Sequence, residues 1–245
     1  MRHFLHSYAL LLRWNILRQR YYLPFMAVIQ TLLAGGVILG FSFLIPQADP
    51  ESALYLATGA PTVVLIVVAM VAAPQEVAGQ KREGTFDYYR AMPVPRLAMV
   101  AADATVWVAL AAPGVVLALA IAALRLDLSL TVSPLVVPAF LLVTTAAVAI
   151  GYGVAYALPP RATLLITQII VFVALMFAPV NYPAERLPGW FARVHEFLPF
   201  QYMAQAMRET LNVPAAGVSA RPFLVLTAWA AVGLVVTARI MTRRA

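Results

Sequence analysis

The sequence contains no cysteine and few charged residues. Its 245 residues include 17 Lys and Arg but only 10 Asp and Glu. The absence of cysteine excludes disulfides, thiolate metal sites and cysteine nucleophiles. Charged residues make up 11% of the chain and apolar residues 63%, whereas soluble domains carry roughly 25% and about 45–50%. A soluble fold of this size cannot hide so much apolar surface, so we predict an integral membrane protein.

Motifs for catalysis and nucleotide binding are also missing. The chain has no Gly-x-x-x-x-Gly-Lys-Ser/Thr loop and no His-Glu-x-x-His motif. His3, His6 and His195 are too far apart in sequence to suggest a metal site. We therefore expect no catalytic residue, no metal and no cofactor bound by this chain.

Apolar runs long enough to cross a bilayer, about 20 residues, occur six times. They cover residues 24–45, 54–74, 97–124, 133–158, 163–180 and 222–241. The first run is too long for a cleaved signal peptide and lacks a small-residue cleavage pattern. We predict an all-α membrane protein with six transmembrane helices, forming one transmembrane domain over residues 1–245.

Polar residues inside these runs are rare. Asp103 is the only acid there, and we expect it to pair with Arg96 or with a neighbouring helix, a functional role being the alternative. We expect the milder polar residues to form hydrogen bonds between helices. These residues are Gln30, Thr58, Thr167 and Gln168.

The basic residues flank the apolar runs and set the predicted orientation. The formal net charge is +7, but the basic residues form no patch, so no nucleic-acid partner is expected. Twelve Lys and Arg fall on the side of both termini and five on the other side. The positive-inside rule then places both termini in the cytoplasm. The use of Arg with a single Lys indicates a GC-rich bacterial genome, and hence a bacterial cytoplasmic membrane.

The N-terminal stretch, residues 3–20, precedes the first run. Apolar side chains recur there at helical spacing, and His6, Arg13 and Arg20 fall on another face. This pattern predicts an amphipathic helix on the cytoplasmic surface, with its arginines near anionic membrane lipids. The alternative is a simple topological anchor.

The predicted cytoplasmic loop, residues 75–96, mixes charges of both signs with aromatics. Pro93 and Pro95 prevent a helix from continuing there, so we predict a short helix over residues 84–91. Phe86, Tyr88 and Tyr89 would make a protein-docking anchor, because aromatic residues dominate interfaces. The alternative is a solvated connector.

The predicted external stretch, residues 181–221, is too apolar for a free loop and too interrupted for a span. Its Trp190 and Tyr202 are of the type that prefers the bilayer interface. We predict two short helices in the outer leaflet, whose irregular backbone must be buried in protein or face water.

Three motifs in this order resemble the permease subunits of type-2 ATP-binding-cassette (ABC) exporters. They are Glu83-Gly84-Thr85-Phe86 followed by Met92-Pro93-Val94-Pro95-Arg96, then Pro183-Ala184-Glu185-Arg186-Leu187-Pro188-Gly189-Trp190, then Leu198-Pro199-Phe200-Gln201-Tyr202 with Ala206-Met207-Arg208. Two departures stand out: Asp103 occupies a position that is often Lys in the family, and Pro179 one that is often Gly.

The resemblance implies a division of labour between chains. ATP and Mg would bind to a separate ABC ATPase subunit, present in two copies, and a second permease copy or a homologous permease would complete the transporter. The implied ATPase-coupling residues are Glu83, Gly84, Thr85, Phe86, Asp87, Tyr88, Tyr89 and Arg90. The implied substrate path, from the second and fifth spans, comprises Val63, Val67, Met70, Phe172, Met176 and Phe177. The implied external gate comprises Pro183, Pro188, Trp190, Pro199 and Tyr202.

The predicted function is export of an amphipathic or lipophilic small molecule, such as an antibiotic or drug. Met and Phe in the implied path suit varied apolar ligands. The alternatives are a permease for a lipid or for a polysaccharide or other cell-envelope precursor, and a membrane scaffold that transports nothing. A membrane enzyme would need a cluster of acids or histidines in the spans, which the sequence does not show.

Overall fold

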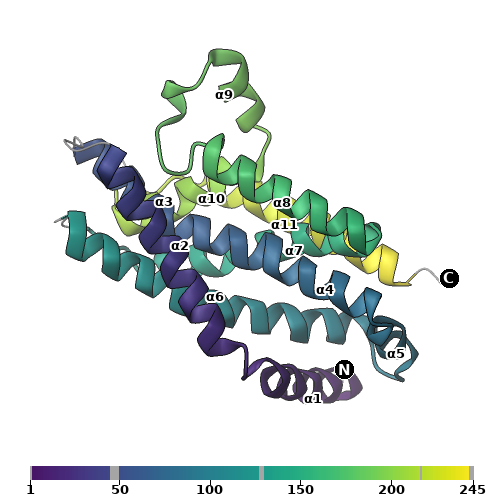
Figure 1. Cartoon of the computed structure of the whole chain (residues 1–245). Coiled ribbons are helices and arrows are strands. Elements are labelled where there is room, and N and C mark those ends of the chain that lie inside the picture. Colours follow the sequence, from purple (N-terminus) through teal and green to yellow (C-terminus); the bar gives the residue numbers. More distant parts are fainter. Residues whose placement is uncertain (1, 45–49, 127–129, 216, 243–245) are drawn as a thin grey trace.

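The computed structural model describes residues 2–44, 50–126, 130–215 and 217–242, and over these residues the chain is helical without a strand. Figure 1 shows a bundle of long helices with a short helical excursion at one side. The helices are α1 (Arg2–Gln19), α2 (Leu23–Leu44), α3 (Pro50–Val67), the π-helix η1 (Val68–Ala72), α4 (Ala73–Arg82), α5 (Thr85–Ala91), α6 (Arg96–Leu126), α7 (Val136–Ala157), α8 (Pro160–Met176), the 3-10 helix η2 (Ala184–Arg186), α9 (Gly189–His195), α10 (Pro199–Leu211) and α11 (Arg221–Thr242).

Among the described residues, five helical segments are long and apolar enough to cross a membrane. They are Leu23–Phe43, Glu51–Arg82, Arg96–Leu126, Val136–Ala157 and Arg221–Met241. The predicted fifth run forms α8, which is apolar but has only 17 residues. The six predicted runs therefore all form helices, and five of them reach spanning length.

The second apolar run does not end at Pro74. Instead α3, η1 and α4 form one continuous 32-residue helical segment that extends to Arg82. A proline inside a helix clashes with the carbonyl four residues earlier. Here the turn widens into a π-helix, in which the Ala73 N–H donates to the Val68 carbonyl, and Pro74 starts the next α-helix. Residues 75–82 of the predicted loop are thus helical, and the loop proper is short.

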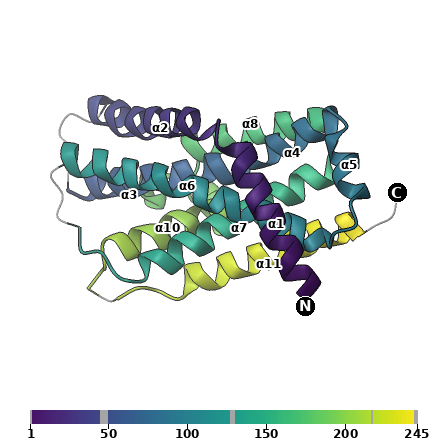
Figure 2. The same cartoon turned by 90° about the horizontal axis from the view of Figure 1, so that it is seen from below.

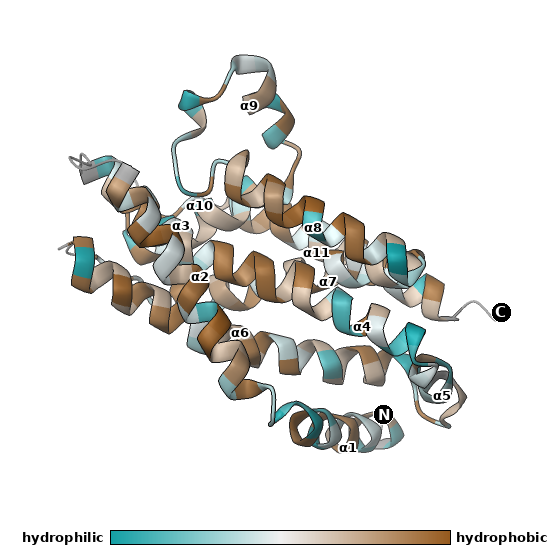
Figure 3. Cartoon of the chain, viewed as in Figure 1, coloured by the Kyte–Doolittle hydropathy of each residue, from teal (hydrophilic) through white to brown (hydrophobic). Residues whose placement is uncertain are grey.

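The α3–η1–α4 segment forms the centre of the bundle. It packs against α2, α6, α7, α8 and α10, and α7 in turn packs along α11. Gly151 of α7 lies against the π-helix, where an added Cβ would approach the Ala69 carbonyl oxygen to 2.8 Å. In Figure 3 the hydrophobic colour runs along the long helices, and hydrophilic residues gather near α5. Large apolar side chains stay exposed on α2, α8 and α11, as expected of surfaces that face lipid or another chain.

Helix α1 crosses the bundle obliquely and packs against α6, as Figure 2 shows. The predicted helix is present, but the side that it buries is polar. Ser7, Asn15 and Gln19 are buried, whereas Leu5 and Trp14 are 60% and 55% exposed. Other polar residues of α1 do meet α6: the Tyr8 and Thr105 hydroxyls lie 3.0 Å apart, and Arg18 pairs with Asp103. The start of α1 and the end of α11 lie toward the α5 end of the bundle.

Candidate functional site: the α5 end of the bundle

Helix α5 is a seven-residue helix between the end of α4 and the start of α6. Its N-cap Gly84 has φ 75°, a left-handed conformation that favours glycine and turns the chain sharply after α4. Its C-cap Met92 is extended, as expected of a residue that precedes Pro93. Gly84 and Pro93 thus mark the two ends of this helix in the sequence. The structure has a short helix, Thr85–Ala91, within the predicted residues 84–91.

One side of α5 is seated on the bundle. The Phe86 ring lies 5.7 Å from the Tyr156 ring of α7, and the Lys81 ammonium lies 5.4 Å from the centre of the Phe86 ring. The Tyr89 hydroxyl accepts a hydrogen bond of 3.1 Å from Arg18 of α1. Phe86 and Tyr89 are half-buried, so these two predicted docking aromatics hold α5 in place.

The opposite side of α5 faces outward. Tyr88 is 67% exposed, and Glu83, Gly84 and Asp87 are exposed as well. Thr85 is half-buried, and the side chain of Arg90 lies outside the described residues. The structure thus divides the predicted coupling residues into a seated set, Phe86 and Tyr89, and an outward set in which two acidic side chains, Glu83 and Asp87, accompany Tyr88.

Arg18 joins α5 to three other helices. Its guanidinium lies 3.6 Å from a carboxylate oxygen of Glu76 on α4 and 3.7 Å from one of Asp103 on α6. Tyr152 of α7 donates a hydrogen bond to the other Asp103 oxygen. A buried carboxylate needs such compensation, because removing it from water is costly. The expectation that Asp103 pairs with a neighbouring helix is confirmed, and the partner is Arg18 of α1.

Arg96, the other partner expected for Asp103, binds elsewhere: it donates to the main-chain carbonyl of Met241 at the end of α11. Lys81 has a similar role at the end of α7, where its ammonium donates to the carbonyl oxygens of Ala155, Tyr156 and Leu158 at 2.6, 3.2 and 3.1 Å. The last carbonyls of a helix lack partners within it, so a cation there is favourable. The sequence suggested neither contact, because the paired segments are far apart along the chain.

The predicted path residues fall into two groups. Val63 and Met70 are buried inside the protomer, and Val67 is half-buried. Phe172, Met176 and Phe177 on or next to α8 are 58%, 52% and 43% exposed. The structure therefore does not bring the two groups together on one surface of this chain.

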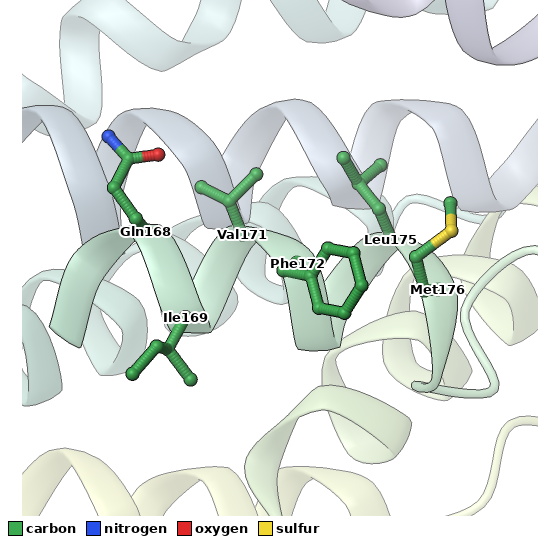
Figure 4. Close-up of a pocket in the computed structure, with 6 residues that line it drawn as sticks. All are labelled: Gln168, Ile169, Val171, Phe172, Leu175 and Met176. Atoms are coloured by element: carbon green, nitrogen blue, oxygen red, sulfur yellow. The ribbon is translucent and has the colours of Figure 1, made fainter. Parts of the chain in front are cut away.

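Phe172 and Met176 of the exposed group border a shallow groove of about 530 Å³ along α8. Figure 4 shows its lining, which comes entirely from this helix. The lining residues are Gln168, Ile169, Val171, Phe172, Leu175 and Met176. Gln168 is thus the one polar side chain on this face, and it contributes to the groove instead of to a helix pair.

The predicted gate residues lie around α9 and α10, away from α5 (Figure 1). Tyr202 is buried, donates a 2.8 Å hydrogen bond to the Glu196 carbonyl and accepts one of 3.3 Å from Arg221. Pro183 and Pro199 are buried, whereas Pro188 and Trp190 are exposed, the latter by 70%. Two short helices, α9 and α10, are present in this stretch, and the Phe191 ring of α9 makes an edge-to-face contact with the Phe177 ring, their centres 6.0 Å apart.

Arg208 of α10 forms a junction that sequence reasoning placed only within a motif. It donates to the Val180 carbonyl at 2.7 Å and to the Thr58 hydroxyl at 3.2 Å, and its guanidinium stacks 3.7 Å from the Tyr55 ring centre. Among the described residues no carboxylate pairs with it. Burial lowers the pKa of Arg208 to about 10, so it stays protonated at neutral pH. A basic residue in an apolar helix was the signal available in the sequence.

Two other polar residues of the spans also form the expected contacts between helices. The Gln30 amide donates to the Leu110 carbonyl at 2.9 Å, and Thr167 accepts from Gln75 at 2.9 Å. Within the described ranges, no three His, Asp or Glu side chains group closely enough to hold a metal ion. The contacts of Arg18, Phe86 and Tyr89 at the α5 end join α1, α4, α5, α6 and α7.

Comparison with known proteins agrees with this architecture. The family model described as "ABC-2 type transporter" matches residues 10–212, from the middle of α1 to the residue after α10. None of the curated proteins compared with the chain matches it. The matched region contains α5, Arg18 and its partners, and the short helices α9 and α10. The chain therefore belongs to the ABC-2 type transporter family, as a membrane permease subunit whose family implies a partner ABC ATPase.

Proposed function

We propose that this chain is the membrane subunit of an ATP-driven exporter in a bacterial cytoplasmic membrane, with α5 as the coupling helix that docks an ABC ATPase. The observation that carries the proposal is the division of α5. Phe86 and Tyr89 seat the helix on the bundle, while Tyr88 and Asp87 face outward beside Glu83. The exposed aromatic and charged residues of α5 suit binding of the ATPase. Because the other side of α5 is fixed to the bundle, a movement of the ATPase would be transmitted through α5 to the bundle.

The contacts of Arg18 would transmit this movement of α5 to the other helices of the bundle. Tyr89 on α5 bonds to Arg18, which pairs with Asp103 on α6, and Asp103 accepts from Tyr152 on α7. Movement of α5 would then displace α1, α6 and α7 together. ATP and Mg would act on the ATPase subunits, one for each of two permease chains.

The exposed face of α8 supports a second permease copy, or a homologous permease, as the partner across the path. Leu165, Ile169, Phe172 and Met176 form one exposed stripe at helical spacing. With 17 residues, α8 lies at the lower end of the range of about 17–25 residues that spans a bilayer. We assign it as a span too, the fifth in chain order, which brings the total to six. Both termini would then be cytoplasmic, on the side of α5.

The substrate that this surface favours is an amphipathic or lipophilic small molecule. The α8 groove is lined by five apolar side chains and a single amide, Gln168. Ligand pockets of this kind bind through apolar contacts, with a few polar groups for orientation.

Docking is tested by co-purifying the ATPase with variants of the outward tip of α5. Tyr88→Ala should weaken capture of the ATPase about 30-fold, the loss typical of an interface hot spot. Tyr21→Ala is the matched control, since Tyr21 is 73% exposed and lies outside α5. Equal capture by both variants would place the docking surface elsewhere.

Coupling is tested separately with Glu83→Arg. In reconstituted vesicles this charge reversal should leave ATP hydrolysis measurable while transport of a lipophilic dye falls. Normal transport with the tip of α5 scrambled would rule out the coupling role.

A further inference from the structure

A cavity of about 570 Å³, here called the inner cavity, lies beside α5 and is separate from the groove on α8. It is bordered by the C-terminal end of α1, the start of α2, α4, α5, Trp107 of α6 and Leu164 of α8. Its volume falls in the range of about 300–1,000 Å³ typical of small-molecule sites. The cavity is also much larger than the space that a single bridging water needs.

The wall of the inner cavity changes from polar to apolar along its length. Arg82, Glu83 and Tyr89 border it at the α5 end, where α4 leaves the bundle. Phe25 and Met26 of α2 border it farther from that end. A wall of this kind suits an amphipathic molecule whose polar group lies near α5 and whose apolar body extends toward α2.

Two unpaired donors decide the chemistry of the polar group. The Gln19 side chain is only 7% exposed and lines the cavity, yet its amide nitrogen has no hydrogen-bond partner. The Nε of Arg18 is likewise buried without a partner. Buried donors are rarely left unpaired, because each costs about 1–3 kcal/mol. The Gln19 amide nitrogen and the Arg18 Nε therefore each lack an acceptor, although the terminal nitrogens of Arg18 already pair with Glu76, Asp103 and Tyr89.

The two acidic residues that line the inner cavity are either already paired with other side chains or exposed at its edge. Glu76 pairs with Arg18 at 3.6 Å and accepts from Gln80 at 3.2 Å, while Glu83 is exposed. A cation would therefore gain little there, whereas an oxygen acceptor would satisfy Gln19 and Arg18 together. We propose that the inner cavity binds an amphipathic molecule through a carboxylate or phosphate group held by Gln19 and Arg18.

Two sources can supply that chemistry: the head group of a membrane lipid, or a transported compound collected before export. The inference takes one point from the proposed function, which is that this cavity lies on the cytoplasmic side of the membrane. Binding itself requires neither ATPase nor transport, so the two proposals can fail independently.

The test uses Trp107, which lines the cavity, as a fluorescent reporter in the full-length chain. Trp14, Trp190 and Trp229 are replaced by Phe, so that Trp107 is the one remaining tryptophan. In a neutral detergent, dibromostearate should quench Trp107 saturably, and unbrominated stearate should reverse the quenching. A brominated alkyltrimethylammonium of the same chain length should bind at least about tenfold more weakly, because it carries no acceptor.

Gln19→Leu should weaken dibromostearate binding about tenfold by removing one donor to a charged group. Gln201→Leu is the matched control, since Gln201 also has an unpaired buried amide atom but lies on α10. Competition by stearate in the otherwise unsubstituted reporter gives the same information if Gln19→Leu fails to fold. Equal affinity for the cationic probe, quenching that does not saturate, or a normal affinity in Gln19→Leu would each overturn the proposal.

The source is identified by repeating the measurement in nanodiscs containing phosphatidylglycerol brominated on its acyl chains. Saturable quenching that depends on Gln19 assigns the cavity to membrane lipid. Quenching by stearate alone assigns it to single-chain compounds.

Discussion

The two ends of the bundle hold their helices together by different chemistry. At the α5 end, Arg18 pairs with Glu76 and Asp103, and a large cavity lies beside them. At the end that carries α9 and α10, Arg208 binds a hydroxyl, a carbonyl and a tyrosine ring. Ion pairs can exchange partners when helices move, whereas a cation fixed by neutral groups holds one arrangement. This difference predicts that the α5 end deforms more readily than the end that carries α9 and α10.

The largest effect should come from Arg18→Met. This change leaves the Asp103 carboxylate without its cation in a buried position, which costs about 3–5 kcal/mol. Adding Asp103→Asn should recover most of the loss, because the charge is then removed while an oxygen remains for Tyr152. Unfolding in detergent of both single variants and the double variant measures the coupling. Simple addition of the two penalties would contradict the pairing.

At the end that carries α9 and α10, Arg208→Met should cost less, about 1–3 kcal/mol, because it leaves the Val180 carbonyl without its donor but leaves no buried charge, and the Thr58 hydroxyl still donates to the Leu54 carbonyl. No neutralisation of an acid should rescue it, and Glu209→Gln is the control. The same unfolding assay applies. Rescue by Glu209→Gln would show that this end also depends on an ion pair.

Packing should separate the ends in the same way. A Cβ on Gly59 would lie 2.4 Å from the Asn181 side-chain oxygen and 2.6 Å from the Val180 carbonyl oxygen, so Gly59→Ala should destabilise by about 1–3 kcal/mol. A Cβ on Gly79, which borders the inner cavity, meets nothing within 4 Å. Gly79→Ala should therefore stabilise by about 0.5–1 kcal/mol through helix propensity. Equal effects in thermal unfolding would refute the difference in packing.

The smallest effect is a pH dependence at the end that carries α9 and α10. His195 is fully buried and burial lowers its pKa below 6.5, so the unfolded chain binds the proton more readily than the folded one. Stability should be constant above about pH 7 and fall as the pH drops below 6.5, by at most about 1.4 kcal/mol per unit. His195→Phe should remove this dependence in thermal unfolding, and replacing the exposed His6 should not. An unchanged pH profile in His195→Phe would mean that other groups titrate.

Most of the helices could be predicted from the sequence, because apolar runs and prolines act locally. The runs at 24–45 and 97–124 match α2 and α6 to within a few residues. Pro74 misled the prediction of a helix end. The clash that usually ends a helix there is relieved by the π-helix, against which α7 packs closely through Gly151.

The candidate site was predicted in position but not in arrangement. Spacing placed Phe86, Tyr88 and Tyr89 on one short helix, yet their division between bundle and exterior depends on Tyr156 and Arg18, which are distant in sequence. For the same reason the polar contact face of α1 was missed: its partners lie on α6.

The sequence alone determined that the chain is helical, apolar and interrupted by one polar segment between the second and third runs, since these properties follow from residue type and local spacing. Only the tertiary structure decided which polar groups meet. It brought Arg18 to Asp103 and Arg208 to Val180, and it left Gln19 unpaired beside a cavity. Pairing inside a bundle depends on how helices cross, and that is set by the packing of surfaces far apart along the chain.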